Sequence, residues 1–86
     1  MYLHLGQSVV VPEADVIGIF DLDNTTGSHI TRKFLSDAEK AGRVINVSDE
    51  LPRSFIVTGT GNEISVHLSQ LSPQTLLRRS ETMRFE

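Results

Sequence analysis

The sequence predicts an α+β domain in which a small antiparallel or mixed β-sheet packs with one long and one short helix. Short apolar runs are separated by glycine, proline and polar turn residues, as is typical of strands. One segment has apolar residues at helical spacing, and a Ser-Pro pair near the C-terminus indicates a second helix start. The predicted order is three strands, a helix, two or three strands and a helix. We expect residues 1–79 to form one domain and residues 80–86 a polar C-terminal tail.

Three strands are predicted in the first 20 residues. Largely apolar runs at residues 2–5 and 9–11 indicate two short strands, because Gly6 and Pro12 end them. Residues 16–20 (VIGIF) are apolar on both faces of an extended chain, which is typical of a strand covered on both sides. We therefore expect residues 16–20 to form a central strand of the sheet.

The long helix is predicted from a stripe of apolar residues that recurs at a spacing of 3.6 residues. The stripe consists of Ile30, Phe34, Leu35, Ala38 and Ala41. Residues 21–28 are rich in Asp, Asn, Thr and Ser and supply a turn and cap before the helix, and Gly42 stands where a helix-ending glycine belongs. Lys33 and Asp37 are four residues apart and are expected to pair on the exposed side.

Strands return in the second half of the chain. They are expected at residues 44–47, 54–58 and 63–69. Residues 59–62 (GTGN) predict a hairpin turn rather than a phosphate cradle, because a strand follows them instead of a helix. Ser72-Pro73 predicts the N-cap and first residue of the short helix, which continues to Arg79.

Composition and charge exclude several classes of protein. Eight basic and eleven acidic side chains give a net charge of −3, so a generic polyanion binder is excluded. Residues 51–86 carry four basic and three acidic side chains, against four and eight in residues 1–50, so any basic patch is expected in the C-terminal half. The chain has no cysteine, no signal peptide and no apolar run of membrane-spanning length, which favours a cytoplasmic protein without membrane contact.

An acidic motif follows the third predicted strand. Residues 20–25 (FDLDNT) resemble the first motif of the haloacid dehalogenase-like phosphatases, in which the first Asp is the nucleophile and the second the general acid/base. Such an enzyme also needs a basic residue and a later acidic pair on further parallel strands, and too little chain remains to supply them. We therefore expect Asp21 and Asp23 to act in a turn and helix cap, with no catalytic residue; a phosphatase fragment stays a remote alternative.

The histidines do not follow a metal-binding pattern. His4 and His67 lie on predicted short strands with no histidine or carboxylate at ligand spacing, and His29 lies at the start of the predicted long helix. We therefore expect neither a metal ion nor another cofactor, and ordinary surface or cross-strand packing for these side chains.

Five segments, spread over nearly the whole chain, carry a family resemblance. They are residues 2–6 (YLHLG), 10–11 (VV), 17–21 (IGIFD), 53–57 (RSFIV) and 71–79 (LSPQTLLRR). In these segments the sequence resembles the RemA/RemB family of bacterial extracellular-matrix (biofilm) regulators, and the RemB branch in particular. The resemblance implies a small α+β fold that assembles into ring-like homo-oligomers and binds double-stranded DNA as a transcriptional regulator, without enzymatic activity.

Three arginines are the candidate DNA contacts. The resemblance implies basic side chains in the loop before residues 54–58, where this chain keeps only Arg53, beside Asp49 and Glu50. Arg78 and Arg79 form the other basic cluster of the C-terminal half. Because two carboxylates next to Arg53 repel phosphate, an oligomeric module that binds protein, such as a related family subunit, instead of DNA stays open as the alternative.

Overall fold

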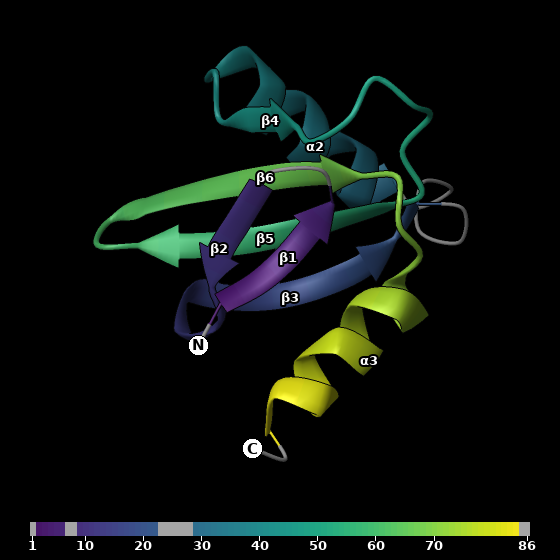
Figure 1. Cartoon of the computed structure of the whole chain (residues 1–86). Coiled ribbons are helices and arrows are strands. Elements are labelled where there is room, and N and C mark those ends of the chain that lie inside the picture. The colour runs from purple at the N-terminus through teal and green to yellow at the C-terminus, as the bar shows by residue number, and fades with distance from the viewer. Residues whose placement is uncertain (1, 7–8, 23–28, 85–86) are drawn as a thin grey trace.

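The structure is a computed structural model that describes residues 2–6, 9–22 and 29–84, with side chains up to residue 79 (Figure 1). The predicted α+β class is confirmed. The described residues form two sheets rather than one: a two-stranded ribbon and a four-stranded mixed sheet. The ribbon and helix α3 pack on one face of the larger sheet, and helix α2 packs on the other.

The two predicted N-terminal strands are confirmed, and they pair with each other to form the ribbon. Strand β1 (Tyr2–Gly6) pairs antiparallel with β2 (Val9–Pro12). Side chains alternate along β1, so that Leu3 and Leu5 are buried against the larger sheet while Tyr2 and His4 are exposed. The short 3₁₀ helix η1 (Glu13–Asp15) then leads the chain into that sheet.

The larger sheet has the strand order β3-β5-β6-β4. Its strands are β3 (Val16–Asp21), β4 (Val44–Asn46), β5 (Ser54–Thr60) and β6 (Glu63–Ser69). The predicted hairpin is confirmed: β5 and β6 pair antiparallel around a turn in which Gly61 has a φ of 61°, a left-handed conformation that suits glycine. Strand β4 pairs parallel to β6, and β3 pairs antiparallel to β5.

The prediction of a central strand at residues 16–20 is wrong, because β3 lies at the edge of the sheet. The strand buried on both faces is β5, whose residues Ser54–Thr58 are all buried. One side of β3, carrying Val16 and Ile19, packs toward the ribbon, whereas Ile17 on β3 is 63% exposed. The apolar character of β3 on both faces is therefore not explained by the packing of this chain alone.

Helix α2 (His29–Lys40) forms where the apolar stripe predicts it. Ala38 is buried and Leu35 packs beside it against Phe55, Val57 and Val66 of the sheet. The predicted Lys33–Asp37 pair forms with a distance of 3.2 Å from Nζ to Oδ2, and Gly42 after the helix has a φ of 72°. The predicted cap at residues 21–28 lies mostly outside the described residues, Asp23 included.

Helix α3 (Pro73–Arg84) begins where Ser72-Pro73 predicts it, and the backbone N–H of Thr75 donates to Ser72 Oγ at 3.2 Å. The helix is longer than expected: it has 12 residues, as α2 does, because it continues past Arg79. A polar tail from residue 80 and a domain boundary there stay predictions. Neither helix, nor any other in the described residues, has the length and apolarity to cross a membrane.

Two buried clusters hold these layers together. On the ribbon side the cluster contains Leu3, Leu5, Val11, Val47, Ile56 and Leu76. On the α2 side it contains Ala38, Phe55, Val57 and Val66. Successive residues of β5 thus serve opposite faces, since side chains alternate along a strand. Leu76 is the fully buried residue through which α3 joins the ribbon-side cluster.

Candidate nucleic-acid interface

Arg53 is presented from a backbone that is fixed on both sides. It immediately precedes β5, where its N–H donates to the Ser69 carbonyl at 2.8 Å and its carbonyl accepts from the Leu22 N–H at 3.0 Å. The Arg53 residue itself is exposed. Because the main chain is held by hydrogen bonds to both neighbours, the Arg53 side chain projects into solvent from a defined position at one end of the sheet.

The loop before Arg53 is acidic and exposed. Its turn is closed by the Glu50 N–H, which donates to Ser48 Oγ at 3.0 Å. Asp49 and Glu50 are both exposed, and Leu51 beside them is 86% exposed. A phosphate that approaches Arg53 from the side of this loop therefore meets two carboxylates.

Helix α3 carries Arg78 and Arg79, and both are exposed. Arg79 follows the buried Leu76 by three residues, so it lies on the side of the helix that faces the ribbon, and its Nη1 donates to the His4 carbonyl at 3.4 Å. That single long hydrogen bond leaves most of the five guanidinium donors available for another partner. Arg78 is one residue round the helix and points in a different direction.

The corner between β6 and α3 connects the segment that carries Arg53 to the helix that carries Arg78 and Arg79. Ser54, the residue after Arg53, donates from Oγ to the Leu71 carbonyl at 2.8 Å. Ser69 Oγ accepts from the Leu71 N–H at 3.1 Å and donates to the Leu5 carbonyl. The structure thus places Arg53 near the start of α3 and places Arg78 and Arg79 further along that helix. Their role in DNA contact stays a prediction.

The acidic motif and the histidines do not assemble into a further site in the described residues. Asp21 ends β3 and pairs with Ser54 of β5 in the sheet, while its proposed catalytic companion Asp23 lies outside the described residues. The described part of the chain contains no group of three or more His, Asp or Glu side chains that could hold a metal ion.

His67 is the one described histidine that is buried. It lies on β6 opposite Ile56, and its Nδ1 is buried with no hydrogen-bond partner. Burial lowers the pKa of His67 below its usual value of 6.5, and a hydrogen bond to the backbone of Ile56 opposes this effect more weakly. The imidazole is therefore neutral in the folded chain at neutral pH.

We expect the free energy of unfolding to fall as the pH drops below about 6.5. The unfolded chain protonates His67 at higher pH than the folded chain does, so protonation favours unfolding through this window, whereas the contribution is constant at higher pH. Urea midpoints at pH about 7.5 and about 5.5 measure the change. His67→Gln, which cannot titrate, should show a smaller difference. An equal difference in both proteins would assign the pH dependence to other groups.

An open apolar groove between β3 and α2 is a feature that the sequence analysis missed. Its most exposed lining residues are Ile17 on the edge strand and Ile30 on the helix. The signal is present in residues 16–20, which are apolar on both faces, and in the apolar stripe of α2. Both patterns equally favour a central strand and intramolecular packing, which is why they do not reveal the groove.

Comparison with known proteins gives the family of the chain. A model of the RemA-like family, described as "Extracellular matrix regulatory protein A-like", matches residues 2–79. The chain is 34% identical over 83 residues to Extracellular matrix regulatory protein B of Bacillus subtilis (strain 168), an alignment that covers 96% of this chain and 94% of that protein. The chain therefore belongs to the RemA/RemB family of extracellular matrix regulators, in its RemB branch.

Proposed function

We propose that this chain is a cytoplasmic, DNA-binding transcriptional regulator of the extracellular-matrix (biofilm) type, which acts as a ring-like homo-oligomer and has no enzymatic activity. Membership of a family of regulatory proteins supports the regulatory role. The observation that carries the DNA-binding part is the rigid placement of exposed arginines: Arg53 on an anchored backbone, and Arg78 and Arg79 on a helix fixed through Leu76.

An assembly repeats the net charge of −3 with every subunit, so it can attract DNA only where its arginines cluster. A single chain with a charge of −3 is a weak partner for DNA, since the overall field repels phosphate. An oligomer presents each arginine once per subunit, and individually weak phosphate contacts along one duplex then add up. DNA binding by this chain is therefore coupled to its assembly, and a monomer should bind only weakly.

The acidic loop favours a second candidate function, an oligomeric module that binds another protein, such as a related family subunit. Asp49 and Glu50 are exposed beside an apolar Leu51 side chain, a combination that suits a protein surface better than a phosphate backbone. The two functions differ in their response to salt, because only phosphate binding releases condensed counterions from DNA.

Static light scattering with and without a double-stranded promoter fragment tests the proposal. We expect the free protein at micromolar concentration to have a mass several times the 9.5 kDa of one chain, and a heavier complex to form with DNA at low salt. A 9.5 kDa species alone would remove the assembly. An assembled protein that leaves the DNA free would instead favour the protein-binding module.

A further inference from the structure

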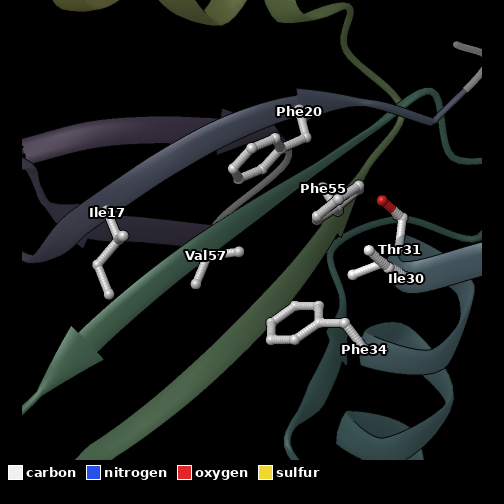
Figure 2. A pocket seen from close by; sticks show the side chains of 7 residues that line it. All are labelled: Ile17, Phe20, Ile30, Thr31, Phe34, Phe55 and Val57. Carbon is white, nitrogen blue, oxygen red and sulfur yellow. The ribbon is translucent and has the colours of Figure 1, made fainter. Parts of the chain in front are cut away.

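The groove between β3 and α2 is an open, apolar depression with a volume of about 320 Å³ (Figure 2). Apart from Thr31, the described residues that line it are all apolar: Ile17, Phe20, Ile30, Phe34, Phe55 and Val57. The Phe20 and Phe55 rings stack at 4.9 Å between centroids, and Gly18 leaves the space that Phe20 occupies, since a Cβ there would lie 2.7 Å from the ring. The sheet wall of the groove is thus preformed.

The groove is open because α2 covers only part of this sheet face. Ala38, in the C-terminal half of the helix, is buried against the sheet. Ile30 and Phe34, in the N-terminal half, stay partly exposed instead. Ile30 is 79% exposed although it belongs to the apolar stripe. Helix and sheet therefore both present apolar side chains to the groove without filling it.

The groove leaves four large apolar side chains exposed. Four groove residues are at least one-third exposed: Ile17, Phe20, Ile30 and Phe34. Contiguous exposed patches on monomeric proteins rarely exceed on the order of 300–600 Å², and the largest are often binding sites. An interface of standard size buries about 800 Å² per partner, of which an apolar patch forms the centre and polar residues the rim. Four clustered large side chains are suited to form such a centre.

The chemistry of the groove and its rim indicates what covers it. None of the described residues that line it is charged, so they offer nothing to a phosphate or to a charged peptide. At about 100° per residue, Lys33 and Asp37 lie on α2 beside Ile30 and Phe34, where they form a rim of balanced charge. Two antiparallel copies of this helix face bring Lys33 of each toward Asp37 of the other. The rim is therefore complementary to itself.

We propose that the groove lined by Ile17, Phe20, Ile30 and Phe34 is closed by the same face of a second copy of this chain, in a two-fold contact with Lys33 and Asp37 at its rim. The inference rests on the proposed assembly and assigns a surface to it. A two-fold contact closes after two copies, so a larger ring uses a second surface as well. The groove lies on the α2 face, and α3 with its arginines packs on the opposite face, so subunit contact leaves the arginines accessible.

Two matched aspartate substitutions test the contact. Ile30 and Leu77 are 79% and 50% exposed and lie on helices on opposite faces of the sheet, so neither Ile30→Asp nor Leu77→Asp should disturb the fold, which circular dichroism verifies. In static light scattering we expect Ile30→Asp to reduce the mass of the assembly by a factor of two or more and Leu77→Asp to leave it unchanged. A wild-type assembly whose mass Ile30→Asp does not alter would overturn the groove contact while the proposed assembly stands. A monomeric wild type would overturn both.

Charge reversal at the rim provides a second, independent test. Lys33→Glu and Asp37→Lys should each lower the mass of the assembly, because each places like charges across the two-fold contact. Mixing the two variants should restore it, since the carboxylate introduced in one chain then faces the ammonium group introduced in the other. An intrahelical effect would not be repaired by mixing. Variants that stay small after mixing would contradict the two-fold geometry, as would variants that assemble fully when alone.

Discussion

Replacement of Arg78 and Arg79 together with alanine is expected to lower the affinity for a double-stranded promoter fragment by about tenfold or more at low salt. Both side chains are exposed on a helix that Leu76 fixes to the domain, and each is repeated once per subunit. The dependence of the affinity on salt should also weaken, by about 0.9 in the log–log slope for each phosphate that is no longer neutralised. Adding Arg53→Ala should reduce both quantities further, across all DNA sequences.

Two substitutions on the opposite face of the sheet are the controls. Arg32→Ala removes the same kind of side chain from α2, and Lys40→Ala removes an exposed cation at the end of that helix. Neither should change the affinity or the salt slope appreciably. Fluorescence anisotropy of a labelled duplex measures both. If the triple arginine variant assembled correctly and bound as the wild type does, the phosphate-binding surface would lie elsewhere.

Leu76→Ala is expected to lower the free energy of unfolding by about 2–5 kcal/mol, a large part of the total for a domain of this size. The Leu76 side chain is fully buried between α3 and the ribbon-side residues Leu3, Leu5 and Ile56. Its truncation leaves a cavity where the helix that carries Arg78 and Arg79 meets the ribbon. Urea denaturation at one fixed protein concentration measures the change, because assembly makes the stability depend on concentration.

The neighbouring leucine gives a matched control for this prediction. Leu77 is 50% exposed, so Leu77→Ala makes the same chemical change on the same helix while removing little buried surface. We expect a cost of less than about 1 kcal/mol for this variant. Equal costs for the two substitutions would show that α3 is not docked through Leu76.

Much of the fold could be predicted from local patterns. The alternation in residues 63–69, the helical stripe of residues 30–41 and the Ser72-Pro73 cap each identify an element, since each reflects backbone geometry within one segment. The position of a strand within the sheet depends instead on contacts between distant segments. The pattern of residues 16–20 therefore identifies a strand correctly but places it wrongly at the centre of the sheet, a place that β5 takes.

The proposed assembly explains both the wrong prediction that residues 16–20 form a central strand and the exposure of Ile30. Apolar residues are expected at surfaces that are buried in the assembled protein, whether the chain itself or a second copy covers them. The pattern of residues 16–20 indicates cover on both sides, and the single chain supplies it on one side through Val16 and Ile19. A partner across the groove would supply the other side.

The candidate interface could be predicted only in part. Charge distribution and family resemblance point to Arg53, Arg78 and Arg79, but they do not show where the fold places these arginines relative to one another. Only Arg53 lies near the corner between β6 and α3, and that placement depends on contacts between distant segments, such as the hydrogen bond from Ser54 to Leu71. The acidic loop before Arg53 could be predicted from the sequence, because it is a short, local and exposed segment.

The most direct test of DNA binding is a titration of a labelled promoter duplex with the wild-type protein at about 50 mM and about 200 mM salt. If repeated arginines bind the phosphates, the protein binds at the lower salt and loses affinity steeply at the higher, as counterion release requires. Absence of binding at about 50 mM, or an affinity that salt does not change, would contradict the account and favour a protein-binding module.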